Sequence, residues 1–270
     1  MNNVIFDIRT TSFAQRTLAK LTNVPISIWK TYLNREREYQ VTDDLIADVI
    51  DTHGRWPMSY ESWEFVYFHI TTSADRCASI KKNGLLDLQK TYSCPDSELR
   101  SFLDGHGILI DLDAQTLTYH NKVYDISYGA CPRQDTEAYK RWAIGRKFYF
   151  DYTTCGFLSV WERTAYGGNV HRRPEILSDI EDLLGVDLSN EWMDMHDPYE
   201  IVARVSGKNI VYSYDDDDSD KNKILSYLTK AYNTAFGEPF EEVILIKNHI
   251  QIAPSSIIEI KPLEHWLSIY

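Results

Sequence analysis

The sequence predicts an α+β protein, in which helices and strands occur in groups rather than in strict alternation. The first 64 residues carry apolar positions at helical intervals. From residue 65 onward, short apolar runs typical of strands dominate, with a few helical segments between them. No Pro/Gly/Ser-rich linker divides the 270 residues. We therefore expect a helical N-terminal region (1–64) and a main α+β domain (65–270).

Composition excludes several classes of protein. No run of about 18 apolar residues is present, so we expect no transmembrane helix. The first residues lack the basic start and long apolar run of a secretory signal. The four cysteines form no CxxC pair, and no Cys/His group has zinc spacing, so we expect reduced thiols, no metal and a cytoplasmic location. A formal net charge of −12 disfavours uniform binding to nucleic acid, so the distribution of charge matters more than its sum.

Helical signals account for most of the N-terminal region. Apolar spacing predicts a helix over 11–20, and Thr42 is a suitable N-cap for a helix over 43–52 that stops before Gly54. Residues 18–33 have the spacing of a helix-turn-helix motif. An ordinary helical hairpin fits the same spacing, and we favour the hairpin.

The main domain opens with a buried strand over 65–72 that carries His69 near its end. A short helix is expected over 73–84, with Ser73 as its N-cap and Gly84 in the left-handed position after its last turn. A titratable side chain at the mouth of a buried strand is a typical component of a binding site. A histidine that caps the strand and bonds a carbonyl group is the alternative.

The remaining elements follow from short apolar runs and helical spacing. Strands are expected over 107–112 and 116–124 as a hairpin, and over 147–152, 156–161, 199–205, 209–214, 242–246 and 257–260. Helices are expected over 174–184 and 222–236. The acidic run 215–220 lacks the spacing of a calcium loop, so we expect a solvated turn there.

Acidic side chains lead directly into the predicted strand over 242–246. Glu241 and Glu242 are neighbours, so they point to opposite faces of a strand and only one of them can face a site. We choose Glu242 because it immediately precedes the apolar run. A solvated strand start is the alternative explanation.

Three sets of motifs occur in a characteristic order. They are Phe68–Thr71 (aromatic-His-x-Thr) with Ile80–Leu85 (Ile-x-x-x-Gly-Leu), Gly156–Ser159 with Tyr166, and Glu242–Leu245 (Glu-Val and two apolar residues) with Ile252–Ile257 (Ile-x-Pro-x-x-Ile). On these motifs, residues 65–262 resemble the His-Tyr-Glu branch of the ADP-ribosyltransferase superfamily. That branch includes the poly-ADP-ribose polymerases, the RNA 2′-phosphotransferases and the DarT-type toxins.

The resemblance implies a split β-sandwich and NAD as a substrate, without a metal. By this resemblance His69 bonds a ribose hydroxyl, Tyr166 and Phe157 stack on the nicotinamide, and Glu242 bonds the ribose 2′-hydroxyl and stabilises a cationic sugar. The other residues that it implies for NAD binding are Thr71, Ser159 and Arg172.

The chain departs from the family pattern at two positions. Ile70 stands where the polymerases have glycine, and Leu158 stands where they have an aromatic residue. The second departure leaves Tyr152 and Tyr149 as alternatives to Tyr166.

Residues 133–173 differ in charge from the rest of the chain, with eight Lys/Arg against four Asp/Glu. Aromatic residues are interleaved with these charges, at Tyr139, Trp142, Phe148, Tyr149, Phe150, Tyr152, Phe157, Trp161 and Tyr166. This pattern suits single-stranded nucleic acid, and core packing of the rings explains it equally well.

The sequence therefore indicates an NAD-dependent mono-ADP-ribosyltransferase that modifies a macromolecule, with nucleic acid (RNA or DNA) favoured slightly over protein. A bacterial toxin or phage-defence effector with a neutralising antitoxin is what the resemblance implies. An RNA 2′-phosphotransferase is one alternative. The other is a non-catalytic nucleic-acid-binding regulator that uses residues 14–33.

Overall fold

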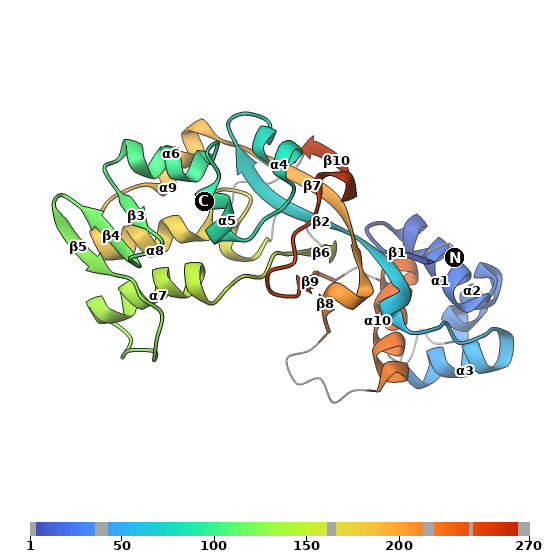
Figure 1. Cartoon of the computed structure of the whole chain (residues 1–270). Helices are drawn as coiled ribbons and strands as arrows, with labels where there is room; N and C mark the ends of the chain where they lie inside the picture. Colours follow the sequence, from blue (N-terminus) through green and yellow to red (C-terminus); the bar gives the residue numbers. More distant parts are fainter. Residues whose placement is uncertain (1–3, 36–42, 161–165, 213–218, 238–239, 264–270) are drawn as a thin grey trace. The chain divides into compact units, whose positions relative to one another are not determined.

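The computed structural model of the chain describes residues 4–35, 43–160, 166–212, 219–237 and 240–263 (Figure 1). Helices and strands are both abundant, and the strands pair mostly in antiparallel fashion, with β1 on β2 as a parallel pair. This confirms the expected mixture of helices and antiparallel sheets. The more specific split β-sandwich stays a prediction. Among the described residues, no helix is both long and apolar enough to span a membrane.

Two compact units make up the fold, and each consists of several chain segments. The first unit contains residues 1–69, 155–163 and 202–246. The second contains residues 70–154, 164–201 and 247–270. The division of the chain into regions 1–64 and 65–270 stays a prediction.

The first unit is a sheet with helices. Its described elements are β1 (Val4–Asp7), α1 (Thr11–Thr22), α2 (Ile26–Arg35), α3 (Asp43–His53), η1 (Tyr60–Ser62), the first part of β2 (Trp63–Ser73), β6 (Cys155–Ser159), the last part of β7 (Asp197–Ser206), η3 (Gly207–Asn209), β8 (Ile210–Val211), α10 (Asp220–Phe236) and β9 (Glu242–Ile246). The strand order is β7–β2–β6–β9–β8, with β1 on β2. The expected N-terminal helices are confirmed, and β1 was not predicted.

Aromatic rings form the core between the sheet and α10. The Tyr227 ring of α10 lies 4.9 Å from the Phe65 ring of β2 and 5.5 Å from the Phe6 ring of β1. Trp63 stacks on Phe6 at 5.7 Å and is almost fully buried. These contacts place α10 on the face of β2 that carries residues 63 and 65.

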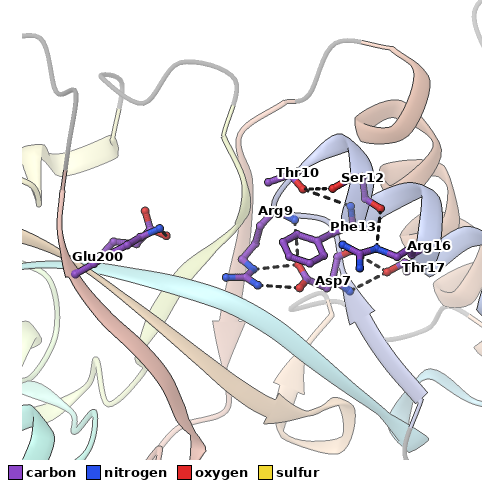
Figure 2. A network of polar contacts seen from close by, with 9 residues as sticks. Asp7, Arg9, Thr10, Ser12, Phe13, Arg16, Thr17 and Glu200 are labelled. Atoms are coloured by element: carbon purple, nitrogen blue, oxygen red, sulfur yellow. Dashed lines mark hydrogen bonds and ion pairs between the residues drawn. The ribbon is translucent and has the colours of Figure 1, made fainter.

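Hydrogen bonds of side chains stabilise the junction between β1 and α1 (Figure 2). The Asp7 carboxylate accepts hydrogen bonds from Nε and Nη2 of Arg9 at 3.0 and 2.9 Å. The Thr17 hydroxyl donates to the Asp7 carbonyl group at 2.7 Å and accepts from its N–H group. Thr10 caps α1 by accepting from the N–H group of Phe13. The buried acid therefore has its hydrogen-bonding capacity satisfied at the point where the strand becomes the helix.

The second unit contains a helical layer and a small meander of three antiparallel strands. Its described elements include α4 (Ala78–Asn83), α5 (Leu88–Ser93), α6 (Glu98–Gly105), β3 (Leu109–Asp111), β4 (Thr116–Tyr119), β5 (Lys122–Asp125), α7 (Glu137–Tyr149), η2 (Gly167–Asn169), α8 (Glu175–Leu184), α9 (Ser189–Met195), η4 (Pro254–Ser256) and β10 (Ile257–Pro262). The predicted hairpin is confirmed, but residues 116–124 split into two strands. His120 and Asn121, both with positive φ, form the tight turn between them.

The strand predicted over 147–152 is wrong, because residues 147–149 form the end of α7 and residues 150–152 lie in no strand. Thr136 caps that helix by accepting from the N–H group of Tyr139 at 3.1 Å. Ile144 and Phe148, one helical turn apart, are fully buried in the core of the second unit. The N-cap and the buried stripe therefore stabilise a helix here, despite the strand propensity of the aromatic residues.

The N-cap predicted at Ser73 is also wrong. Helix α4 begins at Ala78, after Cys77 in a left-handed conformation (φ 61°). Residues 73–77 instead form a turn around Glu98, whose carboxylate accepts from the N–H group of Ala74 at 2.8 Å and from the Ser73 hydroxyl at 2.7 Å. Gly84 does end the helix with positive φ (83°), and a Cβ there would lie 1.9 Å from the Ile252 carbonyl oxygen.

Glu98 gives a prediction for acid stability. Burial raises its pKa, but hydrogen bonds from His196, Ala74 and Ser73 outweigh burial and lower the pKa from 4.5 to about 2. Its contribution is therefore fully present above pH 4.5 and is lost as the pH falls toward 2. We expect Glu98→Gln to remove on the order of 1–2 kcal/mol of this pH-dependent stability, discounted for partial exposure. Denaturant unfolding between pH 5 and pH 2 measures this loss of stability, and Glu61→Gln, at an exposed position, is the control. If the stability of both variants depends on pH in the same way, Glu98 does not contribute to acid stability as described.

Candidate active site

Three neighbouring strands of the first unit carry the first, middle and last motifs of the chain. Strand β6 lies between β2 and β9 and is antiparallel to both. Phe157 pairs with Phe68 on one side and with Val243 on the other. Segments that are separated by more than 80 residues in sequence therefore become direct neighbours.

The register places His69 and Glu242 on the same face of these strands. One step from the pair Phe68–Phe157, His69 lies opposite Gly156, which is itself paired with Ile244. Opposite residues of antiparallel strands share a face, and residues two apart on one strand share a face as well. Glu242 is two residues before Ile244 on β9, and the register shift beside it, between Phe157 and Ser159, lies in β6. Glu242 therefore projects to the side on which His69 projects, and its ion pair with Lys230 places it on the side of α10.

His69 is half-buried and is oriented by the backbone of β6. Its Nδ1 atom lies 2.7 Å from the Cys155 carbonyl oxygen, so Nδ1 carries the proton and donates it. Burial lowers the pKa of His69 below 6.5, although the bond to Cys155 acts in the opposite direction. The ring is therefore neutral at pH 7, and its Nε2 atom presents a lone pair that can accept a hydrogen bond.

Glu242 is half-buried at the first position of β9. Its Oε2 atom forms an ion pair with the Lys230 ammonium group of α10. Within the described part of the chain, Oε1 of Glu242 has no hydrogen-bond partner. Neighbouring Glu241 is exposed and lies just before the strand. The lysine fixes the carboxylate while leaving one oxygen able to accept a ligand hydroxyl.

Tyr67 is a polar side chain on this face that the sequence analysis missed. It lies two residues before His69 on β2, and its ring covers Gly156, where a Cβ would come within 2.5 Å of the ring. Tyr67 is fully buried, and its hydroxyl has no hydrogen-bond partner among the described residues. Burial also raises its pKa. The spacing of Tyr67 and His69 was the available signal, because residues i and i+2 of a strand share a face.

Gly156 allows this close packing, which gives a second prediction. A Cβ at this position would lie 2.5 Å from Cδ2 of Tyr67 and 2.6 Å from the Phe68 carbonyl oxygen, which belongs to the backbone and cannot swing aside. We expect Gly156→Ala to lower the free energy of unfolding by about 1–3 kcal/mol. Thermal unfolding measures the change. Gly105→Ala, where a Cβ meets nothing within 4 Å, is the control; equal stability of the two variants contradicts the packing described.

The other residues of the predicted site are placed differently. Phe157 is buried and stacks on Phe68 at 5.6 Å, on the opposite face from His69 and Glu242, which argues against a shared contact with one ring of NAD. Ser159 is buried, and its hydroxyl donates to the Phe240 carbonyl oxygen at 2.8 Å. Residues of the predicted set that belong to the second unit are Thr71, Tyr166, Arg172 and the alternatives Tyr149 and Tyr152. His69, Tyr67 and Glu242 are therefore the polar side chains that the first unit brings to one face of its sheet.

Comparisons of the chain with protein-family models, with curated proteins and with solved structures gave no match. Among the described residues, no group of three or more His, Cys, Asp or Glu side chains is arranged to hold a metal ion.

Proposed function

We propose that the protein is an NAD-dependent mono-ADP-ribosyltransferase that modifies a macromolecule, with nucleic acid favoured over protein as the acceptor. The observation that carries this proposal is the arrangement of β2, β6 and β9. These adjacent strands bring His69 and Glu242 to one face, with Gly156 between them. A histidine and a carboxylate so placed can bind two neighbouring hydroxyl groups of one sugar.

The proposed reaction breaks the bond between the nicotinamide nitrogen and C1′ of its ribose. The electron pair of that bond leaves with nicotinamide, which becomes neutral, and positive charge develops on the ribose. An acceptor oxygen or nitrogen then bonds to C1′ and loses its proton. The protein has to hold the sugar, stabilise its charge and receive that proton.

The side chains on the shared face suit these tasks. The neutral His69 ring can accept a hydrogen bond from a ribose hydroxyl through Nε2, because Nδ1 is held by Cys155. Oε1 of Glu242 can accept from the 2′-hydroxyl, and its carboxylate is close enough to the sugar in such a complex to favour the cation. Lys230 partly offsets that negative charge and keeps the carboxylate in one orientation. The toxin or phage-defence role and the antitoxin rest on the sequence resemblance alone, and the cytoplasmic location rests on the cysteine pattern and the first residues of the sequence.

Acceptor labelling tests this function directly. Purified protein is incubated with NAD⁺ labelled in its adenylate phosphate, together with DNA, RNA and cell protein in separate reactions. The proposal predicts label in one acceptor class and release of nicotinamide. Loss of a 2′-phosphate from RNA would indicate the phosphotransferase instead. Binding of duplex DNA without any NAD⁺ binding or turnover would indicate the regulator and would overturn the transferase.

A further inference from the structure

A row of four aromatic rings lies on the surface of the second unit. The Tyr139 and Trp142 rings of α7 stack at 5.6 Å, Trp142 and Tyr128 at 6.0 Å, and Tyr128 and Phe150 at 5.0 Å, with interplanar angles of 22–30°. We call this row the aromatic ladder. Phe150 is 55% exposed and Tyr128 37% exposed, so the ladder ends in solvent. Two adjacent rings of the ladder are thus exposed, and exposed apolar patches are typical of interaction sites.

The ladder is separate from the core of its unit. Helix α7 buries Ile144 and Phe148 on its inner side, and Gly145 packs against the Ile126 carbonyl group. Tyr139 and Trp142 lie on another side of the helix, together with Arg146. The loop that bears Tyr128 is fixed in turn, because the indole N–H of Trp142 donates to the Gly129 carbonyl oxygen at 2.9 Å. The rings are thus held in place without filling the core.

Charge around the ladder indicates the kind of partner. Residues 127–150 carry five Lys/Arg against two Asp/Glu, in a chain with a net charge of −12. Lys147 is paired with Glu175, and Arg141 lies 3.9 Å from Glu137. The guanidinium carbon of exposed Arg146 lies 5.7 Å from the centroid of the Trp142 ring. The negative charge of half-buried Asp179 in α8 attracts Arg146 at longer range, without an ion pair between the two among the described residues.

Exposed Arg133 adds a second positive charge in the loop before α7. No ion pair is formed by Arg133 or Arg146 within the described ranges. Both guanidinium groups are therefore available to a phosphate.

We infer that the aromatic ladder binds single-stranded nucleic acid. Flat rings bind the faces of bases, which are accessible in a single strand and already stacked in a duplex. A base adds to the exposed Phe150 end of the ladder, and Arg146 meets the phosphates of the same strand. The further step, that the ladder holds the acceptor of the transferase, rests on the proposed function; binding of the strand does not.

Fluorescence anisotropy with the full chain tests the inference. The probes are labelled oligo-dT and oligo-U of about 12 nucleotides, matched to the usual site sizes, and a duplex of the same length. We expect both single strands to bind more tightly than the duplex, and Phe150→Ala and Tyr128→Ala each to weaken binding about tenfold. We expect Arg146→Gln to make the slope of the logarithm of the association constant against the logarithm of salt concentration less negative by about 0.7, because one phosphate contact is lost.

Trp56→Ala is the matched control. Trp56 is a half-buried ring of the first unit with the Lys221 ammonium group 4.5 Å from its centroid, but it stacks on no other ring of the described residues. Circular dichroism and thermal unfolding verify that each variant is folded. Duplex binding equal to single-strand binding, or equal affinities of the wild type and the two ladder variants, would overturn the inference.

NAD⁺ hydrolysis without an acceptor, measured on the same proteins, separates this inference from the proposed function. If single-stranded nucleic acid binds in a way that depends on the ladder, but the protein does not hydrolyse NAD⁺, the proposed transferase function is contradicted and the role of the ladder is supported. If the protein hydrolyses NAD⁺ but binds no single-stranded nucleic acid, the role of the ladder is contradicted and the proposed transferase function is supported.

Discussion

Replacing Glu242 with glutamine is expected to lower the rate of ADP-ribosyl transfer about 10²–10⁴-fold, because the neutral amide neither stabilises a cationic ribose nor accepts a proton. The shape of the side chain and one acceptor oxygen remain, so NAD⁺ binding changes much less than kcat. Release of nicotinamide from labelled NAD⁺ under single-turnover conditions measures the chemical step.

Two matched variants separate a catalytic role of Glu242 from a structural one. Glu241→Gln alters an exposed neighbour and is expected to leave the rate unchanged. Lys230→Met removes the same ion pair from the side of α10 while keeping the carboxylate. If Glu242 only supports the fold, Lys230→Met and Glu242→Gln will have equal effects on activity. In our account Lys230→Met retains activity to within about tenfold, which is a change of about 1.4 kcal/mol in the barrier.

Replacing His69 with phenylalanine, which keeps a ring of similar size, is expected to weaken NAD⁺ binding about tenfold through the loss of one hydrogen bond to the ribose. The pH dependence carries a further signature. Because burial lowers the pKa of His69 below 6.5, the ring is neutral at pH 7 and takes up a proton only at lower pH. Binding should therefore be constant above pH 6.5 and should weaken below it, as Nε2 becomes a donor.

Isothermal titration of NAD⁺ from pH 5 to pH 8 measures this profile. The His69→Phe variant should lack the weakening at acidic pH that the wild type shows. His53→Phe, a change at an exposed histidine of α3, is the control and should keep the wild-type profile. An unchanged profile in His69→Phe would show that another group is responsible.

Much of the fold was predictable from local patterns. Helix α10 was expected from the apolar stripe that includes Ile224 and Leu228, and Ser219 caps it one residue before its observed start. Strand β9 has the predicted bounds, because its apolar run is bounded by acidic and basic residues. The strand predicted over 147–152 was wrong because short aromatic runs have strand propensity, whereas the cap at Thr136 and Ile144, which is buried with Phe148 one turn later, lie before the run.

The site was only partly predictable. His69 and Glu242 stand at strand positions that the sequence marks, and their shared face follows from the pairing of both strands with β6, which no local pattern contains. Tyr67 was hidden because it lies inside an aromatic run that indicates only burial. The interleaved aromatics that the structure describes are likewise divided: Phe148, Phe157 and Tyr166 are buried, whereas Phe150 is on the surface. Composition alone cannot predict which of them are buried, because burial depends on the face of the helix or strand on which each ring lies.

The most direct test of the central claim is a crystal structure of the protein with carba-NAD⁺, in which a carbocycle replaces the nicotinamide ribose and prevents cleavage. The account predicts the hydroxyl groups of that ring within hydrogen-bond distance of Nε2 of His69 and Oε1 of Glu242, on the face of β2, β6 and β9 that bears Tyr67. A dinucleotide bound away from these two side chains, or no binding at millimolar concentration, would contradict it.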